Sequence, residues 1–183
     1  KRNFSGLEEG IFGRFDLSYD AKKIVLAYKK PNKGYRIYEV GVDGSGLRQL
    51  TLDGADEAEM LKQYGHGYDD MDPCYLPSGK IMFVSTRTKR AVLCHNAFTS
   101  TALHVMDADG KNLHCISGNT VNEFAPCTMD DGRVIYTRWE YVDKGCGDVQ
   151  SLWSMRPDGS GSCHVYKNNV ALPATLIDAR SIP

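Results

Sequence analysis

A ten-residue stretch decides the fold, because the chain repeats it three times. It reads VDGSGLRQLT at residues 42–51, ADGKNLHCIS at residues 108–117 and, more loosely, PDGSGSCHVY at residues 157–166. Each copy carries an Asp-Gly turn followed by a short run that suits a β-strand. Repetition at such intervals is typical of repeat architectures, in which every copy is one supersecondary unit.

A second stretch precedes each copy and predicts a pair of strands. It reads YDAKKIVL at residues 19–26, LPSGKIMF at residues 76–83 and MDDGRVIY at residues 129–136. Gly79 and Gly132 occupy the turn, where positive φ is needed, and Lys22 replaces them in the first unit, so that turn is expected to differ. With a third strand before the Asp-Gly turn and a fourth after it, each unit is predicted to form a four-stranded antiparallel sheet.

The second strands are apolar on both faces, which predicts how the sheets pack. Ile81 and Phe83 point to one side of their strand, and Met82 and Val84 point to the other. Such a sheet must be covered on both faces, and a helical period is visible only near residues 57–64. We therefore predict an all-β fold, a β-propeller arc of about three four-stranded antiparallel blades. It would be part of a larger ring, because closed propellers have roughly 4–8 blades. A β-sandwich of repeated hairpins is the alternative.

The repeats also predict the organisation of the chain. Blade-like repeats are expected at about residues 12–52, 69–117 and 122–166, with an acidic insert at 53–68 between the first two. Residues 167–183 are expected to start a further blade. The 183 residues open on Lys1 without a leader, and we interpret the chain as a piece of a longer protein.

Composition disfavours several classes of protein. The 22 Lys and Arg residues balance 23 Asp and Glu residues, and a net charge of −1 does not suit a nucleic-acid binder. No apolar stretch approaches the roughly 18 residues of a membrane span. The sequence has no Gly-x-Ser-x-Gly, no phosphate-binding loop and no His-Glu-x-x-His, so whether the protein is an enzyme stays open.

Six cysteines indicate an oxidising compartment, and we predict an extracytoplasmic location, periplasmic or secreted. None has Cys-x-x-Cys spacing, which disfavours a zinc ribbon. Cys74 is expected to open an inner strand, with Cys94 at the same edge of the blade, and Cys127 and Cys146 occupy the matching places. Two disulfides, Cys74–Cys94 and Cys127–Cys146, are therefore predicted, each stabilising the fold by ~3 kcal/mol. Buried free thiols are the alternative.

Two sets of motifs resemble known propellers. Residues 106–110, Met-Asp-Ala-Asp-Gly, followed by Asn112-Leu113, resemble the TolB-like (WD40-like) propeller repeat, and the resemblance covers about residues 12–166. Residues 68–81 and 134–143, the latter with the run Tyr-Thr-Arg-Trp-Glu-Tyr, are similar to the middle, propeller domain of the hydrazine synthase alpha subunit and its relatives. Residues 177–183 look like the start of that family's next blade.

The resemblance implies a scaffold. In hydrazine synthase the chemistry belongs to haem iron, and the haem-attachment motif Cys-x-x-Cys-His is absent from this chain. Haem is therefore expected only in domains outside this segment, and no cofactor is implied within it. Fold transfers between relatives more safely than activity does.

The acidic insert leads into the candidate ligand residues. In a propeller, the connection from an outer strand to the next inner strand crosses toward the central channel, so Asp69, Asp70 and Asp72 are expected near one channel mouth with His66 close by. Glu123 takes the place of Asp70 in the next repeat. These oxygen ligands could hold Ca²⁺ or, with His66, a transition metal. Solvated carboxylates that cap turns are the alternative.

Three further residues are candidate contacts for an anion or a partner. Arg87 and Arg138 end second strands, where each could bind an anionic ligand or pair with a carboxylate. Trp139 follows Arg138 and could stack against a ligand or partner. Packing between blades is the alternative.

The sequence therefore predicts a scaffold or binding propeller. It would present channel-mouth loops to a partner protein, to a cofactor domain or other domain of the same chain, or to a small ligand, with no nucleic acid and no membrane span. One alternative is a metal-dependent enzyme at the channel mouth. Another is the gating propeller of a serine peptidase.

Overall fold

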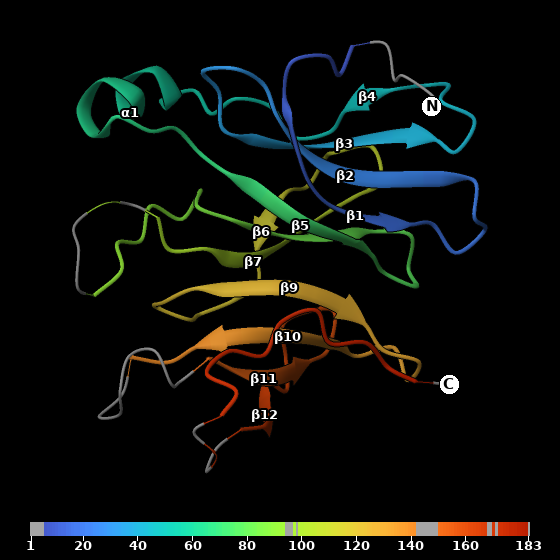
Figure 1. Ribbon diagram of the computed structural model, residues 1–183, viewed down its shortest axis with the longest axis vertical. Coiled ribbons are helices and arrows are strands. Elements are labelled where there is room, and N and C mark those ends of the chain that lie inside the picture. The colour runs from blue at the N-terminus through green and yellow to red at the C-terminus, as the bar shows by residue number, and fades with distance from the viewer. Residues whose placement is uncertain are drawn as a thin grey trace.

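The computed structural model describes residues 6–93, 97, 99–141, 150–167, 170 and 172–182. Within these ranges the chain forms three four-stranded antiparallel sheets, each built from four consecutive strands. Figure 1 shows the sheets layered in chain order, from the N-terminal sheet to the C-terminal one. The predicted all-β propeller arc is therefore confirmed.

Each sheet takes its strands in the order in which the chain supplies them. The first sheet contains β1 (Ile11–Leu17), β2 (Lys23–Lys29), β3 (Tyr35–Gly41) and β4 (Arg48–Gln49). The second contains β5 (Asp70–Tyr75), β6 (Ile81–Ser85), β7 (Ala102–Met106) and β8 (His114–Cys115). The third contains β9 (Glu123–Thr128), β10 (Val134–Trp139), β11 (Gln150–Met155) and β12 (Cys163–Tyr166).

One helix, α1 (Glu57–Tyr64), lies in the connection between the first two sheets. Buried Arg36 donates from Nη2 to the buried Glu57 carboxylate and anchors the start of this helix to β3. Gly65 ends the helix with φ 76°, a left-handed position that suits glycine. None of the helices in the described residues has the length and apolar character needed to span a bilayer.

The apolar residues on both faces of the middle strands fill the space between the sheets. Between the first and second sheets the buried cluster consists of Val25, Ala27, Ile37, Leu50, Tyr75, Ile81, Phe83 and Met106. Between the second and third sheets it consists of Cys74, Leu76, Met82, Val84, Leu103, Val105, Val134, Tyr136 and Met155. Ile81 and Phe83 thus pack on one neighbour and Met82 and Val84 on the other, as the sequence predicts.

The Asp-Gly turns bring neighbouring sheets into close approach. Gly44, Gly110 and Gly159 all have positive φ, of 90°, 85° and 86°. A Cβ on Gly110 would lie 2.4 Å from the carbonyl oxygen of Leu50, and one on Gly159 would lie 2.4 Å from that of Ile116. Glycine at these turns therefore permits both the backbone conformation and the contact with the preceding sheet.

The turn between the first and second strands differs in the first sheet, as expected. Gly79 and Gly132 have φ of 81° and 82°. In the first sheet Ala21, and not Lys22, has positive φ, at 55°. The left-handed residue has moved one position toward the N-terminus.

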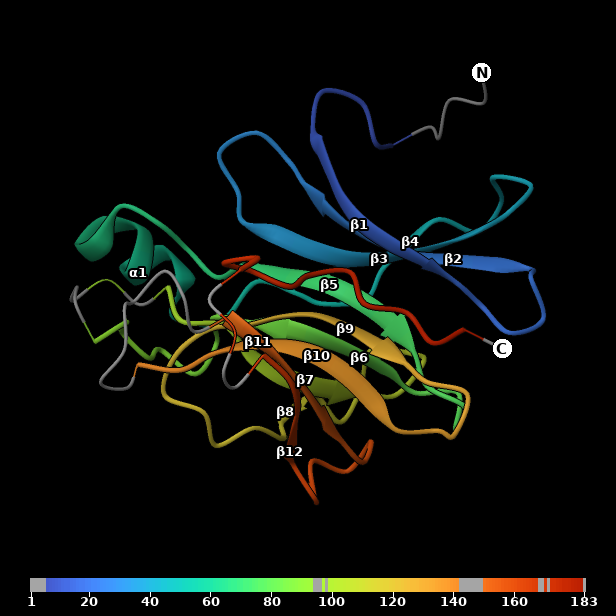
Figure 2. The ribbon, with the colours of Figure 1, turned by 60° about the horizontal axis from the view of Figure 1, so that its bottom comes forward.

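The inner strands β1, β5 and β9 share a bulge. The pairing register shifts between Phe12 and Phe15 in β1, between Met71 and Cys74 in β5, and at the matching place in β9. Asp72 and Ala125 lie in two of these bulges with φ of 52° and 47°. Asp178, in the C-terminal run that is red in Figure 2, has φ of 59° and repeats this geometry. A bulge re-aims nearby side chains, and here it turns them toward a common cavity.

Candidate functional site

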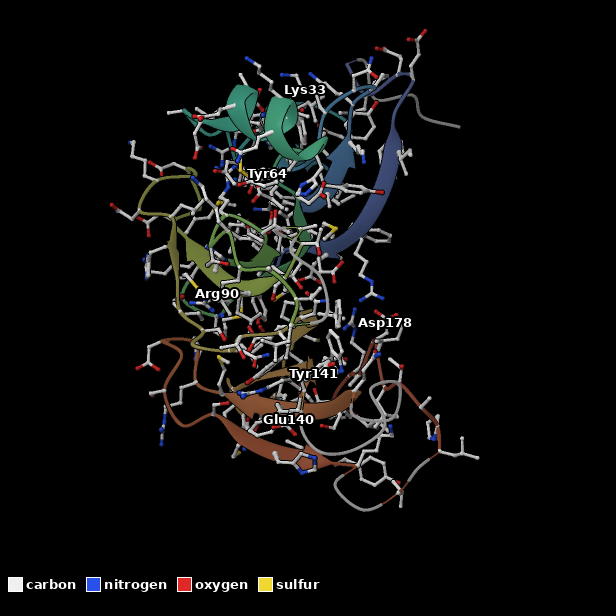
Figure 3. The ribbon with its side chains drawn as sticks, turned by 90° about the vertical axis from the view of Figure 1, so that its left-hand side faces the viewer. Lys33, Tyr64, Arg90, Glu140, Tyr141 and Asp178 are labelled. Atoms are coloured by element: carbon white, nitrogen blue, oxygen red, sulfur yellow. The ribbon has the colours of Figure 1, made fainter. Side chains whose placement is uncertain are left out.

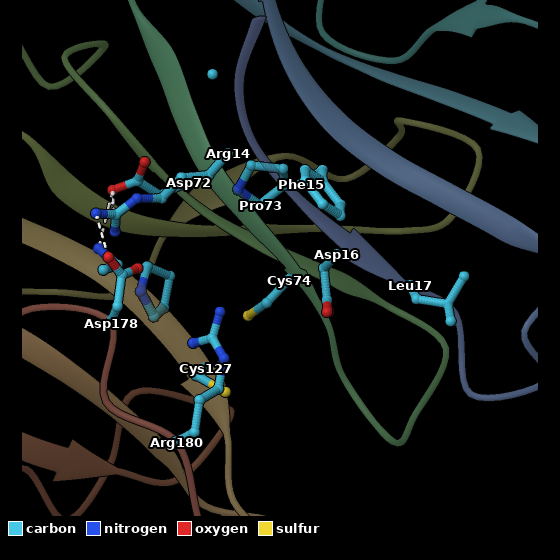
Figure 4. A pocket seen from close by; sticks show the side chains of 13 residues that line it. Arg14, Phe15, Asp16, Leu17, Asp72, Pro73, Cys74, Cys127, Asp178 and Arg180 are labelled. Atoms are coloured by element: carbon cyan, nitrogen blue, oxygen red, sulfur yellow. Dashed lines mark hydrogen bonds and ion pairs between the residues drawn. The ribbon is translucent and has the colours of Figure 1, made fainter. Parts of the chain in front are cut away.

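The inner strands and the C-terminal run surround one cavity of about 520 Å³. It is lined by residues 13–17 of β1, 72–74 of β5 and 125–127 of β9, together with Asp178 and Arg180 (Figure 4). Each contribution comes from the bulge or from the residues that follow it. The cavity therefore occupies the place of a propeller's central channel.

Three charged residues meet at this cavity, and we call them the axial cluster: Arg14, Asp72 and Asp178. Arg14 Nη2 lies 2.9 Å from Asp178 Oδ2, and Arg14 Nη1 lies 3.7 Å from Asp72 Oδ2. Asp72 Oδ2 also accepts a hydrogen bond of 2.9 Å from the Ala125 N–H. The cluster thus ties the first sheet, β5, β9 and the C-terminal run together at the axis.

Burial raises the pKa of the Asp72 carboxyl above its usual range. The Ala125 N–H bond and the Arg14 guanidinium oppose this increase in the pKa of Asp72, and the Asp178 carboxylate adds to it. The surroundings therefore disfavour the charged form of Asp72 relative to a carboxyl in water.

We expect Asp72→Asn to stabilise the protein at neutral pH. When folding raises the pKa of a carboxyl, ionisation of that carboxyl lowers the free energy of unfolding. The loss begins as the pH rises above the ordinary pKa and is complete above the pKa in the folded protein. An amide cannot ionise, yet its oxygen still accepts the Ala125 N–H bond. Urea unfolding between pH 4 and 8 should show an advantage for the variant that grows with pH. An advantage that grows as the pH falls would contradict the assignment.

Asp70 is fully buried and is bound by two neighbours. Ser85 Oγ donates to Asp70 Oδ1 at 2.7 Å, and Arg87 donates from Nε at 2.9 Å and from Nη2 at 2.8 Å. Its side chain has no exposed surface. Arg87, one of the two candidate anion-binding arginines, therefore forms a bidentate ion pair with Asp70 of its own sheet.

The carboxylates of Asp69 and Glu123 each accept a hydrogen bond from a backbone N–H group of the preceding sheet. Asp69 Oδ1 accepts from the Tyr35 N–H at 2.8 Å. Glu123 accepts from the Leu103 N–H at 2.9 Å and from Ser117 Oγ at 2.7 Å, and burial raises the pKa of its carboxyl. These acids hold successive sheets together.

His66 lies beside Tyr64, with ring centroids 6.4 Å apart, and its buried Nε2 has no hydrogen-bond partner. In the ranges that the structure describes, no three His, Cys, Asp or Glu side chains come together in a way that could hold a metal ion. The candidates His66, Asp69, Asp70, Asp72 and Glu123 are thus distributed among separate contacts. A metal site built on them stays a prediction, and elemental analysis of the protein and of Asp70→Ala would test it.

Arg138 and Trp139 lie at the end of β10. The Arg138 guanidinium stacks over Trp153 at 4.5 Å, and the Trp139 ring contacts Tyr141 at 5.7 Å between centroids. Tyr64, Arg90, Glu140 and Tyr141 face the viewer in Figure 3, on the side of the stack where α1 lies. Arg138 therefore packs on an aromatic ring of its own sheet, whereas Tyr141 is exposed.

The structure describes one cysteine of each predicted disulfide, Cys74 and Cys127. β5 begins at Asp70, so the expectation that Cys74 opens the inner strand is wrong; Cys74 pairs with Met82, away from the connection that follows Ser85. Cys74 and Cys127 carry free thiols. Their predicted partners Cys94 and Cys146 lie outside the described residues. The structure does not show either disulfide.

Native-state alkylation should distinguish the thiols. Burial raises the pKa of Cys74, and the side chain is only 4% exposed, whereas Cys163 is exposed. We expect iodoacetamide to modify Cys163 faster than Cys74 by about two orders of magnitude or more, with Cys74 reacting after denaturation. A Cys74 that stays unreactive in denaturant until it is reduced would instead support the Cys74–Cys94 disulfide.

Sequence reasoning missed four residues of the cavity: Arg14, Asp16, Asp178 and Arg180. Their signal is positional, because they lie in or just after the bulge of β1, or in the C-terminal run at and just after Asp178, which has a positive φ as Asp72 does. The bulges can be aligned only once the pairing register is known.

Comparison with solved structures identifies the same architecture elsewhere. The hydrazine synthase of Kuenenia stuttgartiensis matches with a TM-score of 0.70 and 17% identity, over 90% of this chain and 26% of that one. A putative TolB from Agrobacterium tumefaciens matches with a TM-score of 0.64 and 16% identity, over 89% of this chain and 51% of that one. A puromycin hydrolase matches with a TM-score of 0.60 and 15% identity, over 93% of this chain and 24% of that one.

The chain thus spans about half, or less, of the length of these structures. Comparisons with family models and with curated proteins find no match. The three sheets, their shared bulges and these similarities together show a propeller arc that resembles the TolB-like propellers.

Proposed function

We propose that this chain is the binding part of a propeller in an extracytoplasmic protein related to the hydrazine synthase alpha subunit. It would present its channel mouth to a partner protein, to another domain or to a small ligand. One observation carries the proposal: the inner strands and the C-terminal run direct charged side chains, among them Arg14 and Arg180, into one cavity of about 520 Å³. Among the described residues, Arg180 has no carboxylate partner at the axis, so a structural role does not account for its charge.

Hydrogen exchange with mass spectrometry would test this proposal in the intact protein with a ligand or partner bound. We expect slower exchange at residues 13–17, 72–74 and 125–127, which line the cavity. Peptides from the outer strands β4, β8 and β12 serve as internal controls. Protection confined to the outer strands would overturn the proposal.

A second candidate is favoured by the similarity to puromycin hydrolase structures. A propeller arc of this kind would then gate access to a serine peptidase domain elsewhere in the protein. The flanking sequence decides between the candidates, because a peptidase domain would carry a nucleophile motif such as Gly-x-Ser-x-Gly.

A further inference from the structure

Two guanidinium groups line the axial cavity, and they differ in their partners: Arg14 faces two carboxylates, whereas Arg180 faces none among the described residues. Arg14 uses Nη2 for Asp178, while its buried Nη1 makes no hydrogen bond and lies 3.7 Å from Asp72. Arg180 donates from Nη1 to its neighbour's carbonyl, that of Ala179, at 3.2 Å. Among the described residues, no carboxylate forms an ion pair with Arg180, which is exposed and whose side chain also interacts with the Cys127 thiol.

The acidic residues of the cavity already have structural partners. Asp16 accepts from the Tyr75 N–H at 2.9 Å, Asp72 accepts from the Ala125 N–H, and Asp178 pairs with Arg14. These carboxylates hold neighbouring inner strands together. The unused hydrogen-bonding capacity that a ligand could reach therefore belongs to Arg180, whose guanidinium is a donor only.

The remaining walls are apolar. Phe15 and Leu17 contribute from β1, and Pro73 and Pro126 contribute from the bulges of β5 and β9. Phe15 is 68% exposed and Leu17 is 48% exposed, so the walls are open to a ligand. Figure 4 shows the Arg180 guanidinium pointing from the C-terminal run toward Cys74, between these walls.

We infer that the axial cavity binds a monocarboxylate with an apolar body, its carboxylate held by the guanidinium fork of Arg180. This rests on the proposed function, since it names the ligand chemistry of the same channel mouth. Guanidinium and carboxylate match as a bidentate pair. A doubly charged phosphate would meet more repulsion from Asp16, Asp72 and Asp178, and a cation would meet the two arginines. The carboxylate comes from a small organic acid or from the C-terminus of a polypeptide.

Calorimetric titration of the intact protein with hexanoate tests the inference. We expect hexanoate to bind, inorganic phosphate and hexylamine to bind at least tenfold more weakly, and Arg180→Gln to weaken hexanoate binding at least tenfold. Arg180→Lys should lose less, because it keeps the charge without the fork. The matched control is Arg133→Gln, an arginine in the exposed Asp131–Arg133 pair away from the cavity, which should stay within twofold.

A pentapeptide ending in leucine, with a free or an amidated C-terminus, separates the two sources. Binding of hexanoate but not of the peptide supports a small acid, and peptide binding that amidation abolishes supports a chain end. The inference is overturned if neither binds, if phosphate binds more tightly than hexanoate, or if Arg180→Gln changes nothing. If a ligand still slowed hydrogen exchange of the inner strands in the Arg180→Gln variant, the cavity would bind ligands without Arg180. The proposed function would then stand, and this inference would fail.

Discussion

Replacement of Asp70 by alanine is expected to lower the free energy of unfolding by about 3–5 kcal/mol, the range for breaking a buried ion pair from one side. The carboxylate has no exposed surface, and the Arg87 side chain is 18% exposed. Removal of the acid leaves that guanidinium and the Ser85 hydroxyl without their acceptor in a place that water reaches poorly. Chemical denaturation monitored by tryptophan fluorescence measures the loss.

Two controls make the interpretation specific. Asp131→Ala removes one side of an exposed pair with Arg133, and should cost no more than about 1 kcal/mol. The double variant Asp70→Ala/Arg87→Ala should lose less than the sum of the single losses, because the second change removes the unpaired charge. If Asp70→Ala cost no more than Asp131→Ala, the buried pair would not carry the stability assigned to it.

Gly110→Ala should lower the free energy of unfolding by about 3 kcal/mol. Two effects contribute to this loss, and a matched variant can separate them. Its φ of 85° disfavours any side chain, and the new Cβ would lie 2.4 Å from the Leu50 carbonyl oxygen. The first effect is worth roughly 1–2 kcal/mol, and the second forces the first and second sheets apart, as overpacking does at typically 1–3 kcal/mol. Thermal unfolding of the variant and the wild type gives the total.

Gly132→Ala isolates the backbone effect. Gly132 has φ of 82°, and nothing lies within 4 Å of a Cβ added there. We expect a loss of only about 1–2 kcal/mol. Equal losses for Gly110→Ala and Gly132→Ala would show that the close approach between sheets contributes nothing.

The repeated sequences made the fold predictable. The Asp-Gly dipeptides mark the turns between strands, and strands that are apolar on both faces require another layer on each side of their sheet. Ile81 and Met82 alone require a neighbour on each side of the second sheet, and both are fully buried. The local period of residues 57–64 likewise predicted α1, which spans Glu57–Tyr64.

The site was less predictable, because it depends on register. The inner strands carry bulges, and a bulge changes which residues face the axis without leaving a strong mark in the sequence. Asp70 and Asp72 are two positions apart, yet Asp70 pairs with Arg87 inside its own sheet and Asp72 joins the axial cluster. The expectation that Cys74 opens its strand was wrong for the same reason, since Cys74 lies near the end of β5.

The ion pair between Arg14 and Asp178 has a consequence for the order in which the protein folds. The two residues are 164 positions apart, whereas every sheet pairs strands that follow one another in the chain. Hairpins of that kind close within microseconds, but a contact of such long range must wait until all three sheets have docked, and its loop-closure entropy slows the step. A chain emerging from the ribosome would therefore complete its sheets one at a time and assemble its axis last.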